Sequence, residues 1–505
     1  MLQSYVKKIL AARVYDVAIE SPLHDMPFLS RRLDNRVLLK REDLQPVFSF
    51  KLRGAYNKIA SIPEDRREKG VICASAGNHA QGVALAGKHL GIRAVIVMPR
   101  TTPDIKVRAV RERGGKVVLH GDSFDEALAH ALELEKKEGM TFVHPYDDPD
   151  VIAGQGTVGM EVLRQHSGEL EAVFIPVGGG GLAAGMAAYI RYLRPEVKII
   201  AVEPADAACL KAALEKKRRV VLKEVGLFAD GTAVKQVGKE NFRVLRECVD
   251  EVVTASIDEI CAAIKDIFED TRSISEPAGA LAVAGMKKWV AGHKVSGKTL
   301  VAVHSGANVN FDRLRHISER AEIGEQREAI IAVTIPERPG SFRQFCQVLG
   351  KRAITEFNYR YSDDKEASIF VGVQIRPGGN DLEPLLKTLS DKGYPVVNMT
   401  DNEMAKLHIR HMVGGHTPLQ GTGEMLYRVE FPERPGALLN FLLSLGNRWN
   451  ISLFHYRNHG AAYGRVLLGF QVSEGERKAL RAELRKVPYP MVEETGNEAY
   501  RVFLR

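Results

Sequence analysis

Short runs of apolar residues, separated by stretches long enough for a helix, recur between residues 70 and 305. The runs are rich in valine and isoleucine and do not alternate with polar residues, which is typical of buried parallel strands. They are 71–74, 94–98, 116–119, 172–177, 198–202 and 300–303. Stretches between them predict crossover helices at 78–90, 103–113, 123–138 and 151–166. Repeated strand–helix units predict an α/β fold with parallel sheets, in which ligands bind beyond the carboxyl ends of the strands.

The last third of the chain contains an internal repeat. Pro336-Glu337-Arg338-Pro339-Gly340 recurs as Pro432-Glu433-Arg434-Pro435-Gly436, at an offset of 96. Phe357-Asn358-Tyr359-Arg360 is echoed by Phe454-His455-Tyr456-Arg457, at an offset of 97. Each copy predicts a strand, a Pro-Gly turn, a helix and two strands, so a duplicated ferredoxin-like α+β module is expected.

These patterns predict three domains, which suits a chain of 505 residues at roughly 150 residues per domain. We expect a catalytic domain over 1–320 and two ferredoxin-like domains over 329–401 and 424–494, with the glycine-rich stretch 412–423 as their linker. A crevice between two such sheets could bind a small apolar amino acid. Aromatic residues at matching places in the two copies are candidates to line it, although strand packing explains them equally well. They are Phe357, Tyr359, Phe454 and Tyr456.

The composition excludes several classes of protein. The net charge is +8, but the densest basic run, 216–219, has no interleaved aromatic residues, so we expect no nucleic-acid partner. No uncharged apolar run reaches the roughly 18 residues of a membrane span. Charged residues interrupt the apolar residues between Val6 and Ile19, which predicts an amphipathic helix there and no signal peptide. Five cysteines without a C-x-x-C pair predict thiols and a cytoplasmic protein.

Lys51 is the first candidate for chemistry. It lies in Ser49-Phe50-Lys51-Leu52-Arg53-Gly54, with apolar neighbours on both sides. Desolvation lowers the pKa of a lysine, and a neutral amine can form a Schiff base with an aldehyde. Read in isolation, the same residue could also be an exposed lysine at the start of a helix.

Two further motifs open helices directly after predicted strands. Ser75-Ala76-Gly77-Asn78-His79 follows the strand 71–74, where free backbone N–H groups could bind a carboxylate or phosphate, or Ser75 or Asn78 could simply cap the helix. Gly178-Gly179-Gly180-Gly181-Leu182 follows the strand 172–177, and its unshielded amides could bind a phosphate. This loop also satisfies G-x-G-x-x-A, with Glu203 at the end of the next strand, so a nucleotide-dependent oxidoreductase remains an alternative.

A fourth motif, His304-Ser305-Gly306-Ala307-Asn308, lies at the carboxyl end of the last predicted strand. Its serine hydroxyl could hydrogen-bond a ring nitrogen or cap the following turn. The histidines 408, 411 and 416 lack the spacing of a zinc site, so we expect no metal.

Together, the four motifs and the two repeats resemble the fold-type II family of pyridoxal-5′-phosphate enzymes, and in particular its members that deaminate L-threonine. The resemblance runs nearly end to end, and the motifs match in order and spacing. It implies that Lys51 carries the internal aldimine and moves the α-proton. It also implies that Asn78 binds the phenolic oxygen of the cofactor and that Ser75 and Gly77 hold the substrate carboxylate. Residues Gly178, Gly179, Gly180, Gly181 and Leu182 would hold the phosphate, and Ser305 would face the pyridine nitrogen.

The family therefore implies a lyase that converts L-threonine to 2-oxobutanoate and ammonia, as the first step of isoleucine biosynthesis from threonine. The C-terminal repeats would be ACT-like domains through which isoleucine inhibits and valine opposes inhibition, in a homotetramer. Two alternatives remain besides the oxidoreductase. A catabolic serine or threonine dehydratase is expected to lack the double repeat, and an amino-acid sensor would bind ligand only through that repeat.

Overall fold

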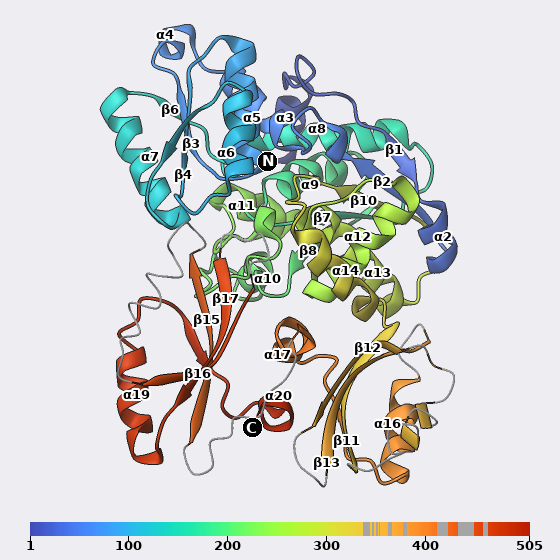
Figure 1. Cartoon of the computed structure of the whole chain (residues 1–505). Helices are drawn as coiled ribbons and strands as arrows, with labels where there is room; N and C mark the ends of the chain where they lie inside the picture. The colour runs from blue at the N-terminus through green and yellow to red at the C-terminus, as the bar shows by residue number, and fades with distance from the viewer. Residues whose placement is uncertain are drawn as a thin grey trace. The chain divides into compact units, whose positions relative to one another are not determined.

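In the computed structural model, the chain forms two compact units, Met1–Ala321 and Glu322–Arg505 (Figure 1). The predicted end of the catalytic domain, residue 320, lies one residue from this division. The structure describes residues 1–336, 344–345, 348–349, 352, 354–361, 366–376, 381–411, 423–432, 449–457 and 463–504.

The first unit contains two sheets. The larger has the strand order β1-β2-β10-β7-β8-β9, in which β1 is antiparallel to β2 and all other neighbours are parallel. Its strands are β1 (Leu23–Asp25), β2 (Arg36–Arg41), β7 (Ala172–Pro176), β8 (Lys198–Pro204), β9 (Glu251–Ala255) and β10 (Thr299–His304). The smaller sheet is parallel, with the order β5-β4-β3-β6. Its strands are β3 (Val71–Ala74), β4 (Ala94–Met98), β5 (Lys116–Leu119) and β6 (Thr141–Phe142).

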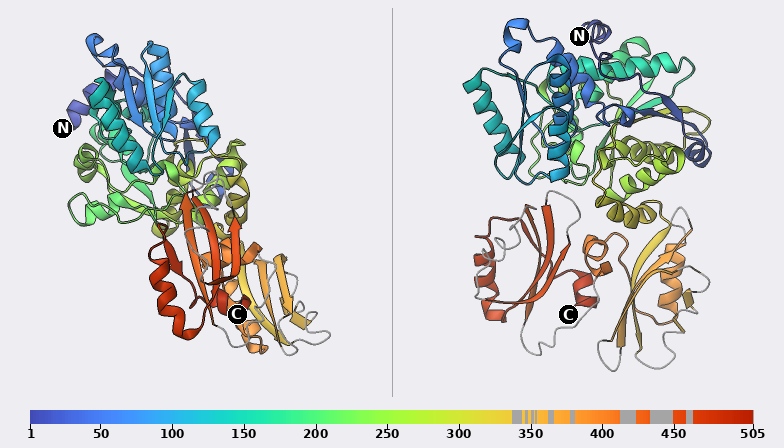
Figure 2. Two further views of the ribbon diagram at one scale, coloured as in Figure 1. Left: turned by 60° about the vertical axis from the view of Figure 1, so that its left-hand side comes forward. Right: turned by 45° about the horizontal axis from the view of Figure 1, so that its top comes forward.

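Helices cover both faces of the larger sheet (Figures 1 and 2). Along β7, Val173 and Ile175 pack on α1, α8 and α9, whereas Ala172 and Phe174 pack on α12 and α13. Because both faces are buried, the strands show no alternation of apolar and polar residues. The helices of this unit are α1 (Leu2–Leu10), α2 (Pro27–Leu33), α3 (Lys51–Ala60), α4 (Glu64–Arg67), α5 (Asn78–Leu90), α6 (Asp104–Glu112), α7 (Phe124–Glu138), α8 (Pro149–Gln165), α9 (Gly181–Leu193), α10 (Cys209–Glu215), α11 (Lys239–Cys248), α12 (Ile257–Thr271), α13 (Pro277–His293) and α14 (Arg313–Gly324), with short 3-10 turns η1 (Glu42–Leu44) and η2 (Asp230–Thr232).

All six predicted strands of the first unit are present, and the four predicted crossover helices are α5, α6, α7 and α8. The predicted N-terminal helix was wrong in its extent, because α1 ends at Leu10. After Leu10 the chain is no longer helical, and the backbone N–H of Arg13 donates a hydrogen bond to the side chain of Asn57. Four strands of this unit were missed. β1 and β6 are only three and two residues long, and charged residues stand within or beside β2 and β9.

The second unit contains two antiparallel sheets with the same topology. Their strand orders are β12-β13-β11-β14 and β16-β17-β15-β18. In both modules the first strand of the module lies between its third and fourth strands, and the second strand lies at the edge beside the third. This is the ferredoxin-like arrangement, so the predicted fold class is confirmed. The strands are β11 (Glu328–Pro336), β12 (Ile354–Tyr361), β13 (Glu366–Gln374), β14 (Val396–Asn398), β15 (Glu424–Pro432), β16 (Asn450–Arg457), β17 (Tyr463–Gln471) and β18 (Met491–Glu493). The helices are α16 (Leu382–Asp391), α17 (Glu403–Leu407), α19 (Arg477–Leu484) and α20 (Glu498–Phe503), with 3-10 turns η3 (Ile409–His411) and η4 (Glu474–Glu476).

The aromatic residues singled out in the repeats occupy equivalent register positions. In the first module Phe357 pairs with Val371 and Tyr359 with Ile369. In the second module Phe454 pairs with Leu468 and Tyr456 with Val466. Their side chains lie outside the described part of the chain, as do 337–340, 433–436 and most of the predicted linker. Their role at an effector site therefore stays a prediction.

The two modules of the second unit share a core between their sheets. In Figures 1 and 2, α16 and α19 lie on the outer faces, while α17 and α20 lie between the sheets. The contacts there are repeated in the two modules at offsets of 95 and 96. Thr400 accepts a hydrogen bond from Ile330 N as Thr495 does from Leu426 N, both at 3.1 Å, and Asn402 and Asn497 cap α17 and α20. Asn402 Nδ2 also donates to Asn497 Oδ1 at 3.2 Å, so the two caps meet each other.

Within the described residues, no helix is both long and apolar enough to cross a lipid bilayer.

Candidate active site

Lys51 is the first residue of α3 and is half-buried. Its amine donates a hydrogen bond to the backbone carbonyl of Pro145 at 2.9 Å. Desolvation lowers the pKa of Lys51 from 10.5 to about 8, against the opposing effect of the nearby Glu276 carboxylate. The amine is therefore available in its neutral, nucleophilic form at moderately alkaline pH.

The segment before Lys51 is hydrogen-bonded to the loop that holds Ser305. Phe50 N donates to Ser305 O at 3.3 Å, and Ala307 N donates to Phe48 O at 2.9 Å. Ser305 is buried, and its hydroxyl donates to the carbonyl of Ala278 at 3.2 Å. To donate to a ring nitrogen, this hydroxyl would have to turn away from Ala278.

Asn78 begins α5 and belongs to a ring of hydrogen bonds with Glu276 and Asn308. Its Nδ2 donates to Glu276 Oε1 at 2.6 Å, and its Oδ1 accepts from Asn308 Nδ2 at 2.7 Å. Asn308 N donates to the second oxygen of Glu276 at 3.0 Å, which closes the ring. Because an amide nitrogen carries two hydrogens, Asn78 keeps one N–H for another acceptor.

Burial raises the pKa of Glu276 from 4.5 to about 7, and the charge of Asp230 adds to this effect. The hydrogen bonds from Asn78 and Asn308 oppose it by stabilising the carboxylate. Glu276 was missed in the sequence because an acidic residue directly before Pro277 at a helix start predicts only an ordinary cap.

The other predicted carboxylate-binding residues lie in the turn between β3 and α5. Gly77 N donates to the hydroxyl of Ser75 at 3.3 Å, and a side chain on Gly77 would meet no atom within 4 Å. The backbone at Gly77 is thus open on the side where a Cβ would stand. A neighbouring residue, His79, is fully buried, and burial together with the charge of Lys51 lowers its pKa to about 3.

The glycine loop lies between β7 and α9, with Gly180 in the left-handed region at φ 93°. Within the described residues, the backbone N–H groups of 178–182 have no hydrogen-bond acceptor in the protein. A Cβ on Gly179 would lie 2.2 Å from the ring of Tyr146, and one on Gly178 would lie 2.8 Å from Thr232. Only glycine fits this close packing, and free N–H groups at the start of a helix are of the kind that binds anions.

Contacts through residues 145 and 146 connect the loop to Lys51. Pro145 accepts from the Lys51 amine, and the next residue, Tyr146, packs on Gly179. Asn241 Nδ2 donates to the carbonyls of both Tyr146 and Gly179, at 3.1 and 2.7 Å. All four motifs predicted from the sequence are thus connected through a few hydrogen bonds and packing contacts.

The side chain of Glu203, the residue that left the oxidoreductase alternative open, binds another part of the protein. It is fully buried, and its two oxygens accept from Leu210 N at 2.7 Å and Lys211 N at 2.8 Å. It binds the start of α10, so it cannot also bind a ribose as a dinucleotide site requires.

Among the described residues, which include His408 and His411 but not His416, no group of three or more His, Cys, Asp or Glu side chains could hold a metal ion.

The site residues fit pyridoxal phosphate. The loop 178–182 offers free N–H groups and the positive end of a helix dipole for the phosphate, and Lys51 offers an amine with a lowered pKa for the aldehyde. Asn78 has one N–H left for an anionic oxygen.

Comparison with known proteins supports the same cofactor. Residues 14–306 match the family model of pyridoxal-phosphate dependent enzymes, and 319–409 and 416–504 match that of the C-terminal regulatory domain of threonine dehydratase. A biosynthetic L-threonine dehydratase of Burkholderia multivorans is 56% identical over 503 residues, which is 99% of each chain.

Two solved structures resemble somewhat less than two thirds of this chain. The processed form of threonine deaminase isoform 2 from Solanum lycopersicum is 51% identical, with a TM-score of 0.63 over 63% of this chain and 93% of that one. A threonine deaminase of T.th. is 37% identical, with a TM-score of 0.57 over 61% of this chain and 99% of that one.

Proposed function

Because this chain belongs to the biosynthetic threonine dehydratases, pyridoxal-phosphate enzymes that carry a C-terminal regulatory domain, we propose that it converts L-threonine to 2-oxobutanoate and ammonia and is inhibited by isoleucine. The single observation that carries the catalytic part is the Lys51 amine, which has a lowered pKa and is connected through residues 145 and 146 to an anion-binding glycine loop.

When bound, pyridoxal phosphate supplies an aldehyde for a primary amine and a conjugated ring that withdraws electrons from the α-carbon of an amino acid. The loop 178–182 would hold the phosphate through its N–H groups, and the remaining N–H of Asn78 would hold the phenolic oxygen. Ser305, once its hydroxyl has turned away from Ala278, would offer a neutral group to the ring nitrogen. A hydroxyl, unlike a carboxylate, would not keep that nitrogen protonated.

Lys51 acts as the base. Its neutral amine takes the proton from the α-carbon of threonine, while Ser75, Gly77 and the neighbouring backbone amides hold the substrate carboxylate. The α-proton and the β-hydroxyl leave together as one water. The resulting enamine tautomerises to an imine, whose hydrolysis consumes one water and releases 2-oxobutanoate and ammonia. The net reaction from threonine is therefore 2-oxobutanoate plus ammonia, with no other co-reactant.

Glu276 and Asn308 support Asn78. Together they determine which end of the Asn78 amide faces the cofactor, because Nδ2 is held by a carboxylate and Oδ1 by an amide N–H. The family also supports a homotetramer as a proposal, which light scattering on the purified protein would test.

The purified protein should show a visible absorption band that borohydride abolishes, and mass spectrometry should then find the pyridoxyl group on the peptide containing Lys51. Steady-state rates with L-threonine and L-serine, with and without isoleucine and valine, would establish substrate and regulation. A protein without the band, or with the label on another lysine, would contradict the proposed site. Turnover that isoleucine does not change would contradict only the regulatory part.

A further inference from the structure

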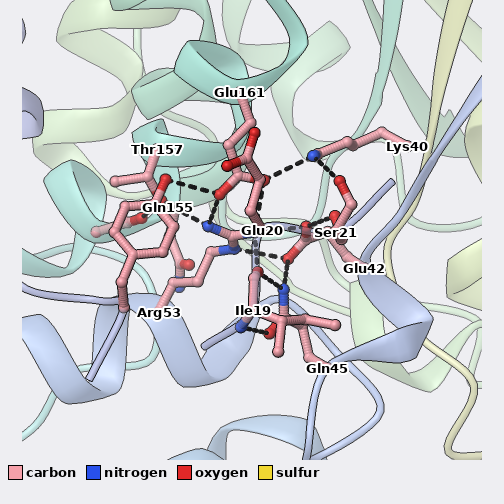
Figure 3. A network of polar contacts seen from close by, with 12 residues as sticks. Ile19, Glu20, Ser21, Lys40, Glu42, Gln45, Arg53, Gln155, Thr157 and Glu161 are labelled. Carbon is pink, nitrogen blue, oxygen red and sulfur yellow. Dashed lines mark hydrogen bonds and ion pairs between the residues drawn. The ribbon is translucent and has the colours of Figure 1, made fainter. Parts of the chain in front are cut away.

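Four charged side chains are completely buried together in the first unit, away from the residues assigned to the reaction (Figure 3). They come from four elements: Lys40 from β2, Glu42 from η1, Arg53 from α3 and Glu161 from α8. Each has a side-chain exposure of 0%. We refer to these four residues as the Arg53 cluster. Its two positive and two negative charges balance.

Arg53 is the centre of the cluster. Its Nε and Nη2 donate to the two oxygens of Glu42 at 2.7 and 2.8 Å, and its Nη1 and Nη2 donate to the two oxygens of Glu161 at 2.5 and 2.9 Å. Nη1 also donates to Thr157 Oγ1 at 3.1 Å, and Nη2 to the carbonyl of Ile19 at 3.1 Å. The guanidinium is therefore held in its plane by two bidentate carboxylates, which a lysine could not reproduce.

The carboxylates are themselves held from the other side. Glu42 accepts from the hydroxyl of Ser21 at 2.5 Å, and Glu161 accepts from Lys40 Nζ at 2.6 Å and from the hydroxyl of Tyr15 at 2.8 Å. Lys40 also donates to the carbonyl of Ser21. The hydrogen-bonding groups of the cluster are thus satisfied, which makes its geometry specific.

Arg53 is in the same helical turn as Lys51. Helix α3 crosses α8 where a Cβ on Gly154 would lie 2.7 Å from both the carbonyl of Arg53 and the Cα of Gly54. The two backbones are in direct contact at this crossing. Helix α8 begins four residues after Pro145, the acceptor of the Lys51 amine. Arg53 and Glu161 therefore join the helix that carries the amine to the helix that follows its acceptor.

We propose that Arg53 is a positioning residue, which holds the first turn of α3 against α8 so that the Lys51 amine stays directed at Pro145 and the cofactor site. The inference rests on the proposed function of Lys51. A role in stability alone explains the cluster poorly, because buried ion pairs seldom stabilise a fold more than apolar residues of the same volume. A guanidinium bound by two bidentate carboxylates has a fixed orientation, and so does the helical turn that carries it. A displacement of about 1 Å at a reacting group can lower rates on the order of 100-fold.

The test uses the full-length holoenzyme with Arg53→Lys, Arg53→Met and the double variant Arg53→Met/Glu42→Gln. The double variant keeps the remaining buried charges, Lys40 and Glu161, in balance, so that loss of positioning can be separated from an unpaired buried charge. The matched control is Asp266→Asn, which removes a buried carboxylate that binds Arg32 and Lys287 at α12. The measurements are the thermal midpoint, the circular dichroism of bound pyridoxal phosphate per mole bound, its release rate, and kcat and KM.

We expect the double variant to fold and to bind the cofactor with weaker induced dichroism and roughly tenfold faster release. Its kcat should fall about 10- to 100-fold with little change in KM, since reacting groups and not substrate contacts are displaced. Arg53→Lys should lie between the double variant and wild type. Asp266→Asn should lower the thermal midpoint without changing dichroism or release rate.

Wild-type dichroism, release rate and kcat in the folded double variant, or the same changes in Asp266→Asn, would overturn the inference. If the double variant does not fold, the same measurements on Arg53→Lys, compared with wild type at the same fraction of folded protein, provide the test. A wild-type protein without the cofactor on Lys51 would instead contradict the proposed function, so the two failures are distinguishable.

Discussion

The candidate site of the first unit and the space between the two sheets of the second unit use polar groups of different kinds. In residues 1–321 the groups of interest are ionisable: Lys51 and Glu276 at the site, and the Arg53 cluster. Between the two sheets of the second unit, the repeated contacts are between neutral groups, the hydroxyls of Thr400 and Thr495 and the amides of Asn402 and Asn497.

This difference matches what we propose for each unit. Proton transfer requires charged groups with shifted pKa values, and burial provides the shift at a large cost in desolvation. An interface that responds to an effector requires contacts that can be exchanged cheaply between two arrangements, and neutral hydrogen bonds of about 1 kcal/mol each suit that requirement. The predictions below test this division, beginning with the largest expected effect.

The largest effect is expected at Lys51. Lys51→Ala should abolish turnover while the fold and the oligomer persist, because both the amine that binds the cofactor and the base are lost. Rates of 2-oxobutanoate formation, together with far-ultraviolet circular dichroism, check this. Substantial turnover by the variant would assign the chemistry to another lysine.

Removal of the second unit tests the division directly. A chain ending after residue 325, one residue past the end of α14, should still deaminate threonine but should not respond to isoleucine. The loss should correspond to a coupling of about 1–3 kcal/mol, or roughly 5- to 150-fold in effector sensitivity. Full isoleucine sensitivity in the folded truncated protein would place the effector site in the first unit.

Gly180→Val should weaken cofactor retention more than folding, because a side chain in the loop disturbs the phosphate-binding N–H groups. The structure adds a cost, since φ is 93° and a Cβ would lie 3.0 Å from Leu245 Cδ1. Gly297→Val is the matched control: its φ is also positive, at 67°, but a Cβ there would meet no atom within 4 Å. Equilibrium dialysis of pyridoxal phosphate should show at least about tenfold weaker binding for Gly180→Val only. Equal affinities in the two variants would mean that the loop is merely a hinge.

A pH dependence follows from Lys51. Uptake of pyridoxal phosphate by the apoenzyme should accelerate as pH rises through about 8, since the neutral amine reacts. Because Glu276 raises the pKa of Lys51, Glu276→Gln should move this midpoint to lower pH. The lowered pKa also determines how stability depends on pH. Between pH 8 and 10.5 the unfolded chain binds more protons at Lys51 than the folded chain does, so the contribution of Lys51 to the free energy of unfolding increases with pH. Stopped-flow absorbance over this range checks the midpoint, and a midpoint near 10.5 would contradict burial of the amine.

The smallest effect is expected between the two modules. Asn402→Ala and Asn497→Ala should each cost about 1 kcal/mol in the free energy of unfolding, because each removes a helix cap. Their contact should add a coupling of about 0.5 kcal/mol in a double-mutant cycle measured by urea unfolding. Asn402→Ala combined with Ser123→Ala, which removes the cap of α7, is the additive control. Strict additivity of the asparagine pair would show that the modules do not communicate through this contact.

The sequence alone determined six of the parallel strands, the crossover helices and the duplicated module. The physical reason is that each depends on a local or periodic pattern, such as a buried run of valines and isoleucines or a repeated turn. It also identified Lys51, Asn78, the glycine loop and Ser305, because each lies directly after a strand or at a helix start, where chain geometry leaves backbone groups free. Whether these residues act as proposed remains for the experiments above to test.

Only the tertiary structure revealed the partners of these residues. Glu276 is 198 positions from Asn78, and Glu161 is 108 positions from Arg53. In the sequence an isolated glutamate or arginine predicts a solvated side chain, since most such residues are exposed. Desolvation, which shifts the pKa of Lys51 and gives the Arg53 cluster its specific geometry, arises only when segments distant in the chain pack together and exclude water.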